Sequence, residues 1–199
     1  MSQTTTLRDL VGLGHTPSRL SESALVLIDC QNTYRTGLMQ LTGVEAAIGQ
    51  AQALLKLARQ HQIPVIHIQH DGGAGSPYDL DTDLGAISSE VAPTDGEMVI
   101  VKQYPNSFIE TSLDQKLKQL GVKNLILAGF MTHMCVNSTA HGAFNLGYHN
   151  TIVASATATR PLAGPDGQLL SAEQVQAGAL AGTRDLYAAV VNTLDELPV

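Results

Sequence analysis

Three residues with the chemistry of a base, a cation and a nucleophile follow apolar runs of the chain. Asp29 and Lys102 each close such a run, and Cys135 follows a third run after a break at Gly129. If the runs are parallel strands, their carboxyl ends meet at one edge of a sheet. A cysteine that opens a helix there faces unpaired backbone N–H groups, which favour a thiolate and can hold an oxyanion. The spacing therefore indicates nucleophilic catalysis by Cys135.

Each of these residue types also has a non-catalytic interpretation. Free cysteine is often a buried apolar filler. An aspartate and a lysine frequently form a surface ion pair, which contributes under about 1 kcal/mol to stability. The convergence of Asp29, Lys102 and Cys135 on one predicted sheet edge favours the catalytic interpretation.

Alternating apolar runs and helical patterns predict the fold that positions these residues. We expect strands over residues 24–28, 65–69, 98–102, 124–128, 151–154 and 186–191, and helices over 44–61, 112–120, 135–146 and 171–184. Most of the strands are continuously apolar, as in a parallel sheet covered by helices on both faces. The sequence therefore predicts a three-layer α/β/α, Rossmann-like domain with a six-stranded parallel sheet in the order 3-2-1-4-5-6.

Two segments fall outside this alternation. Residues 1–22 are polar and interrupted by Gly12, Gly14 and Pro17, which predicts an extended N-terminal arm with one short helical turn. Arms of this kind often pack on a neighbouring subunit. Residues 71–95 are rich in Gly, Pro, Asp and Ser and are too long for an ordinary connection, so we expect a functional loop over the strand ends. The remaining chain, residues 23–199, is predicted to be one domain.

Bulk composition limits the partners and the compartment. The 199 residues, 44% of them hydrophobic, suit one domain, and 11 basic against 18 acidic residues give a net charge of −7. This charge argues against nucleic acid and anionic membranes and favours a small-molecule partner. With only Cys30 and Cys135, no membrane-spanning run and no leader, we expect a cytoplasmic protein without a disulfide. Cys30 is expected on the opposite sheet face from Asp29.

Four motifs along the chain resemble those of the isochorismatase-like cysteine hydrolases, from about residue 23 to the C-terminus. They are Asp29 with Gln31-Asn32, Lys102 before Pro105 and Phe108, Gly129-x-x-Thr132-x-x-Cys135-Val136, and Ala156-x-Ala158-x-Arg160. The first three occur in the order of the family, at the ends of the first, third and fourth predicted strands.

The resemblance implies that Asp29, Lys102 and Cys135 are a catalytic triad. Asp29 would take the thiol proton, and Cys135 would attack a carbonyl carbon to give an acyl-enzyme, which water then hydrolyses. Lys102 would favour the thiolate and position the carboxylate. The reaction implied in this way needs no cofactor and no metal.

The resemblance also implies the backbone around the nucleophile. The family carries a cis peptide before it, which would fall between Phe130 and Met131. The N–H groups of Met131 and Cys135 would then form an oxyanion hole. Candidate substrate-binding residues lie within a few positions of these elements: Gln31, Tyr34, His70, Tyr104, Phe108, Thr132 and His133. The family often has Arg where Tyr104 stands, and aromatic walls would suit a planar amide.

Several alternative functions share parts of this pattern. A metal-assisted amidase of the same fold has an Asp-x-His sequence after the second strand, whereas this chain has His67, His70 and Asp71 in another order. Isochorismatase-type vinyl-ether hydrolysis occurs where the cysteine is replaced, so Cys135 argues against it. A serine hydrolase lacks its Gly-x-Ser-x-Gly motif here. A non-catalytic binding or assembly protein of this fold is disfavoured by the intact triad.

The residues and the family resemblance together predict a cofactor-independent cysteine hydrolase. It would cleave a C–N bond of a small amide or ureido compound. We expect a homo-oligomer, a dimer or tetramer, in which a neighbouring subunit helps to close the pocket.

Overall fold

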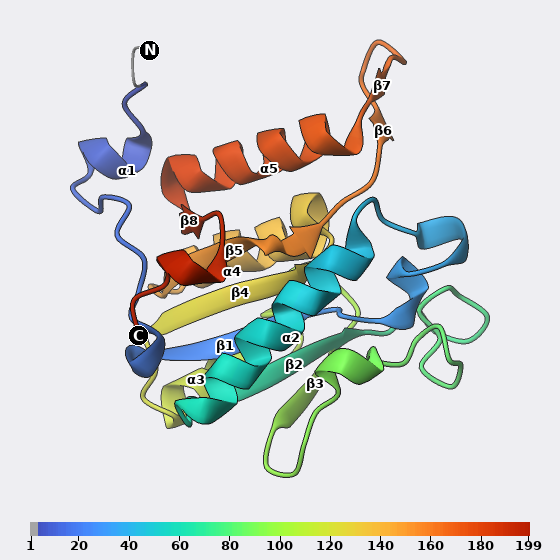
Figure 1. The fold of residues 1–199 in the computed structure, drawn as a ribbon, viewed down its shortest axis with the longest axis horizontal. Helices are drawn as coiled ribbons and strands as arrows, with labels where there is room; N and C mark the ends of the chain where they lie inside the picture. The colour runs from blue at the N-terminus through green and yellow to red at the C-terminus, as the bar shows by residue number, and fades with distance from the viewer. Residues whose placement is uncertain (1–3) are drawn as a thin grey trace.

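A six-stranded parallel sheet forms the centre of the molecule in the computed structural model, which describes residues 4–199 (Figure 1). Its strands are β1 Ser23–Ile28, β2 Val65–His70, β3 Met98–Lys102, β4 Asn124–Phe130, β5 His149–Ala158 and β8 Ala189–Val191. They follow the order β3-β2-β1-β4-β5-β8, which confirms the predicted order 3-2-1-4-5-6.

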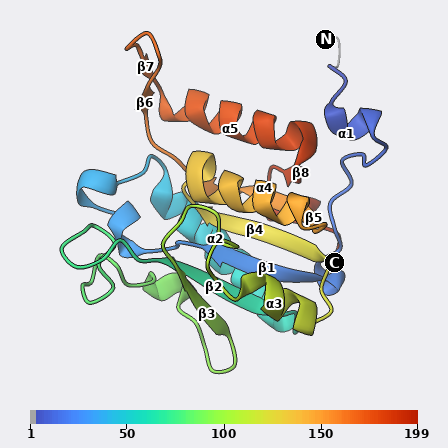
Figure 2. The same ribbon diagram turned by 180° about the vertical axis from the view of Figure 1, so that it is seen from behind.

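Helices cover both faces of this sheet and complete the three-layer architecture. Helix α2, Val44–Gln60, lies in front of the sheet in Figure 1, and the view from behind in Figure 2 shows α3, Leu113–Gln119, and α4, Asn137–Asn145, on the other face. Helix α5, Ala172–Leu186, packs against α4 and β8. The side chains of β1 alternate between the two apolar cores, as a strand buried on both faces requires.

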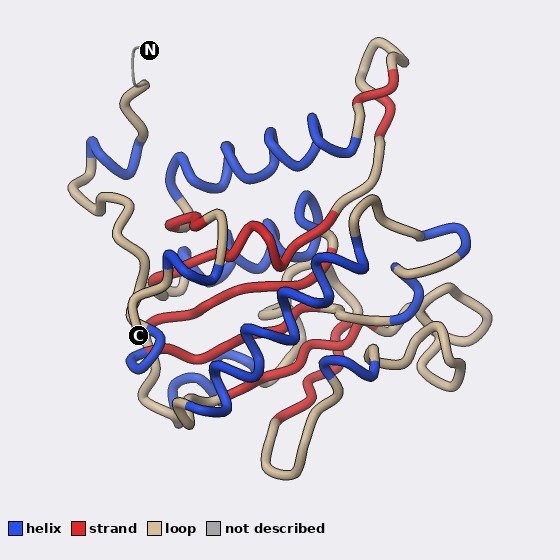
Figure 3. Tube along the Cα trace, in the orientation of Figure 1, coloured by secondary structure: helices blue, strands red, loops and turns tan. Residues whose placement is uncertain are grey.

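Five elements in the C-terminal part of the chain differ from the expectation. Strand β5 extends to Ala158, although Ser155 and Thr157 interrupt its apolar pattern. Helix α5 continues to Leu186, so the last strand is shorter than predicted. Between β5 and α5, β6 Leu162–Ala163 and β7 Leu169–Leu170 form an antiparallel hairpin that projects from the rest of the protein, as Figure 3 shows. Its two-residue strands are too short to give a periodic pattern.

The N-terminal arm contains one short helix, α1 Leu7–Leu10, and lies against α5 of its own chain. The Leu7 N–H donates to Asp185, and the Arg8 guanidinium donates to the Leu186 carbonyl. Residues 71–95 form an irregular loop with a single 3-10 turn, Ser89–Val91. Among residues 4–199, no helix is long and apolar enough to cross a membrane. The division into an arm and one domain stays a prediction.

Candidate active site

Asp29, Lys102 and Cys135 meet at the carboxyl ends of the strands and form what we call the Asp–Lys–Cys cluster. The Lys102 ammonium donates to Asp29 Oδ2 over 2.7 Å and to Cys135 Sγ over 3.4 Å. Asp29 is 0%, Lys102 2% and Cys135 5% exposed, so water screens these contacts little. The structure thus brings together the three residues that the sequence placed at three separate strand ends.

The strand register positions the acid and the cation. Strand β1 ends at Ile28, and the Asp29 N–H donates to the Ile68 carbonyl of β2 over 2.9 Å. Asp29 itself adopts a left-handed backbone with φ of 50°, a conformation that aspartate tolerates better than most residues. His70 of β2 pairs with Lys102 of β3. Lys102 therefore ends a strand that lies two strands away from β1, the strand that Asp29 follows.

The turn after β4 positions the cysteine. Gly129 has φ of 116°, and a Cβ there would lie 2.0 Å from the Ile28 carbonyl oxygen, so only glycine fits. The following Phe130–Met131 peptide is cis, as the resemblance implied. Cys135 does not open the α-helix as predicted. It lies in a π-helical turn, Thr132–Val136, and α4 begins at Asn137. Such turns insert one residue and often occur at functional sites.

Burial dominates the electrostatics of the cluster. It raises the pKa of Asp29, against the opposing effect of Lys102. Burial, followed by the charge of Asp29, raises the pKa of Cys135 to about 12. The resting cysteine is therefore a thiol, in contrast to the thiolate that a helix end alone would favour. A base must remove its proton, and Asp29 Oδ1 is buried without a hydrogen bond to the described residues.

His70 adds a fourth group to the cluster. Its Nδ1 lies 3.1 Å from Lys102 Nζ. Burial and the charge of Lys102 lower the pKa of His70 to about 4, so the ring is neutral near pH 7. An ammonium has only donors, and Nδ1 therefore accepts while Nε2 carries the proton. Gln31 fixes the His70 backbone by accepting from its N–H and donating to its carbonyl.

The other residues predicted to contact substrate occupy different environments. Tyr34 and Thr132 are buried, and the Thr132 hydroxyl donates to the Ala158 carbonyl. His133 is half-buried and bonds through Nδ1 to Thr159 Oγ1. Phe108 stacks on Tyr148 with ring centroids 5.8 Å apart, whereas Tyr104 is 44% exposed. Substrate contact by these residues, and by the equally buried Gln31, stays a prediction.

Two residues near the cluster had no place in the predicted site. Tyr78, from the irregular loop, packs edge-on against the rings of His70 and Tyr34. The distances between ring centroids are 5.0 Å and 5.7 Å respectively. No sequence signal distinguishes it within a loop of turn-forming residues. Arg160 follows β5 at the same sheet edge. It stood in one of the family-like motifs, but without an assigned role.

The two histidines and the aspartate considered for a metal site each contact a different group. His67 is buried and contacts Glu97 Oε2 through Nε2 at 2.9 Å, while His70 faces Lys102. The Asp71 carboxylate accepts the Gly73 N–H within its own loop. Within residues 4–199, no group of three His, Cys, Asp or Glu side chains is placed to hold a metal ion.

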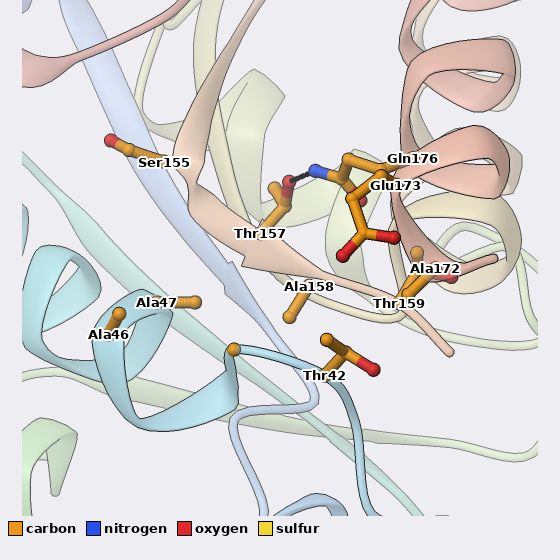
Figure 4. A pocket seen from close by; sticks show the side chains of 11 residues that line it. Thr42, Ala46, Ala47, Ser155, Thr157, Ala158, Thr159, Ala172, Glu173 and Gln176 are labelled. Carbon is orange, nitrogen blue, oxygen red and sulfur yellow. Dashed lines mark hydrogen bonds between the residues drawn. The ribbon is translucent and has the colours of Figure 1, made fainter. Parts of the chain in front are cut away.

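A cavity of about 270 Å³, shown in Figure 4, is lined by none of the three residues of the cluster. It is bounded by the start of α2, the end of β5 and the start of α5. Thr157 and Gln176 share a hydrogen bond of 2.9 Å on its wall. The buried Ser155 Oγ and Gln176 Oε1 have no partner among the described residues. Polar atoms of this kind commonly bind ordered water.

Comparison with known proteins places this arrangement in a family. A family model of the isochorismatase domain matches residues 23–190, which include all three members of the cluster. The chain belongs to the isochorismatase family. It is therefore a hydrolase of the isochorismatase superfamily.

Individual relatives extend over most of this isochorismatase-family chain. A crystal structure of an isochorismatase from Pseudomonas putida KT2440 superimposes with a TM-score of 0.94 at 36% identity, over 98% of this chain and 100% of that one. The secreted isochorismatase effector Isc1 of Verticillium dahliae is 31% identical over 94% of this chain and 97% of its own length. Maleamate amidohydrolase of Pseudomonas putida is 33% identical, over 75% and 76% respectively.

Proposed function

We propose that this protein is a cysteine hydrolase that cleaves a C–N bond of a small amide or ureido compound through an acyl-enzyme on Cys135. The observation that carries the proposal is the contact of one buried ammonium, Lys102, with both a carboxylate and a thiol. An ion pair that served only stability would not require Lys102 to contact the sulfur of Cys135 as well. An amidohydrolase among the relatives supports the choice of a C–N bond.

The geometry supports a sequence of proton transfers. Asp29 takes the Cys135 proton, and its raised pKa makes it a stronger base than an exposed carboxylate. The sulfur then attacks the substrate carbonyl carbon, and the N–H groups of Met131 and Cys135 receive the oxyanion. Asp29 returns the proton to the leaving nitrogen, and later activates the water that releases the acid product.

Lys102 has a separate role in this sequence. When the proton leaves Cys135, the negative charge moves from Asp29 to the sulfur, and the ammonium lies within 3.4 Å of both positions. It therefore stabilises the charge before and after the transfer without moving. In a buried site such a fixed charge is worth more than in water.

The test is intact-protein mass spectrometry combined with ammonia release on a panel of small amides and ureides. We expect wild type and Cys30→Ala to form the adduct and release ammonia, and Cys135→Ala to do neither. Cys30 is the matched control because it is the other buried thiol and lies in the opposite core. Full turnover by Cys135→Ala would refute nucleophilic catalysis. The cytoplasmic location and the homo-oligomeric state stay predictions.

A further inference from the structure

Helix α5 buries few of its side chains against its own chain. Within the described part of the chain, only Ala172 and Thr183 of its 15 residues are buried, whereas α2, with 17 residues, buries seven. A surface helix normally presents charged or polar side chains to water on the face away from the core. The exposed side of α5 carries Ala177 and Ala181 near its middle instead. This side of the helix therefore allows another surface to approach its backbone closely.

Two exposed residues of opposite charge flank these alanines on the same face of α5. Glu173 lies four residues before Ala177, and Arg184 lies three residues after Ala181, spacings that keep side chains on one face of a helix. Among residues 4–199, neither Glu173 nor Arg184 forms an ion pair. We call Glu173, Ala177, Ala181 and Arg184 the α5 stripe. It is acidic at the N-terminal end of the helix and basic at the C-terminal end.

Exposed apolar side chains gather at both ends of α5. Helix α1 contacts the C-terminal end, and there Leu10 is 71% exposed and Val11 is exposed beside it (Figure 1). The β6–β7 hairpin projects at the N-terminal end, where Leu169 is 72% exposed and Leu170 is also exposed. A two-stranded hairpin without a core of its own is marginally stable in water. Grouped apolar side chains of this kind are typical of an interaction surface.

We propose that the α5 stripe, with α1 and the β6–β7 hairpin at its two ends, is the interface of a two-fold dimer of this chain. In an antiparallel pair of α5 helices, Glu173 of each copy lies opposite the partner's Arg184. A parallel pair would place like charges together. Because two-fold packing uses the same surface on both copies, a stripe that is complementary to itself favours a second copy over a different protein.

The antiparallel arrangement also brings the apolar ends together. The hairpin end of one copy meets the α1 end of the other, so the exposed side chains at Leu169 and Leu10 are covered. A stable interface buries about 800 Å² of each partner, which is more than the four side chains of the stripe provide. Apolar surface at the ends supplies the affinity, and the charge pairs fix the orientation.

Charge reversal with rescue tests this interface. Analytical ultracentrifugation across the micromolar range measures the dissociation constant of the dimer. Glu173→Arg and Arg184→Glu each place like charges opposite each other twice in a dimer, so we expect either variant to raise the constant at least about 100-fold. The double variant has opposite charges in exchanged positions and should restore the wild-type constant.

Substitutions at the two ends test the apolar part of the interface. Leu10→Ser and Leu169→Ser each remove a side chain that is exposed in one copy and covered in the dimer. We expect each to raise the dissociation constant at least about tenfold, because the loss occurs twice. Urea unfolding identifies any variant that fails to fold.

Lys56→Glu is the matched control, because Lys56 is exposed on α2 and its reversal changes the net charge as Arg184→Glu does. It should leave the dissociation constant unchanged. The proposal is overturned if wild type is monomeric across the whole range, or if both single reversals on α5 dimerise as wild type does. A folded double variant that stays as weak as the single ones would overturn the antiparallel pairing on which the proposal depends.

Discussion

At the scale of single residues, the cluster uses every donor of one ammonium. Lys102 donates to Asp29 at 2.7 Å, to His70 at 3.1 Å and to Cys135 at 3.4 Å, and three acceptors match its three N–H groups. This arrangement fixes a side chain that otherwise has four rotatable bonds. His70 serves it only while neutral, and its lowered pKa keeps it neutral down to about pH 4. We therefore assign His70 to positioning Lys102 in addition to its predicted place in the substrate wall.

Replacing His70 tests this positioning role. His70→Leu removes the acceptor, and we expect alkylation of Cys135 by iodoacetamide at pH 7 to slow by roughly tenfold, since a hydrogen bond to a charged group contributes about 1.5–3 kcal/mol. His70→Asn, whose amide oxygen can accept from Lys102, should restore most of the rate. Equal rates in the Leu and Asn variants would show that the ring acts only by filling space.

At the scale of elements, the close approach of β4 to β1 places the turn that carries Cys135. The Gly129 Cα faces the Ile28 backbone, and a methyl group there would overlap the carbonyl oxygen that precedes Asp29. The same contact thus brings the end of β4 against the end of β1 and sets the spacing of the acid and the nucleophile. Tyr78, from the irregular loop after β2, packs edge-on against the His70 ring.

Two glycine-to-alanine substitutions distinguish the effect of this close contact on stability from the general effect of adding a methyl group. We expect Gly129→Ala to lower the free energy of unfolding by roughly 2–4 kcal/mol, because it combines a positive φ with a steric overlap. Gly178 lies in the middle of α5, and a Cβ added there would have no atom within 4 Å. Gly178→Ala should raise stability by up to about 1 kcal/mol through helix propensity. Urea unfolding measures both, and a tolerated Gly129→Ala would contradict the close approach.

At the scale of the whole molecule, buried histidines link folding to pH. Burial lowers the pKa of His67, His70 and His133 below the ordinary value. The unfolded chain, with histidine pKa values near 6.5, then binds protons that the folded protein does not. The contribution of these neutral histidines to the free energy of unfolding is therefore fully present above about pH 6.5. It is lost as the pH falls from about 6.5 toward 4.

The histidine at the cluster allows this linkage to be measured. Between pH 7 and pH 5, His70 should account for about 1 kcal/mol of the lost stability, a value reduced from the full shift because the ring is only half-buried. His70→Gln does not titrate, so its unfolding free energy should fall less over the same interval. The comparison is made by urea unfolding at both pH values. An identical fall in the two proteins would place the acid sensitivity elsewhere.

The sequence, with its resemblance to a family, determined the layers and the sheet order, which the structure confirms, and it placed Asp29, Lys102 and Cys135 at the ends of strands. Short apolar runs that alternate with helical patterns are typical of parallel strands, and the polar residues that end such runs are expected at one shared edge of the sheet. Three outcomes were decided by tertiary structure: the thiol state of Cys135, the contact of His70 with Lys102, and the exposure of the α5 stripe. Each depends on burial and on distances between segments far apart in the chain, and no local pattern encodes either quantity.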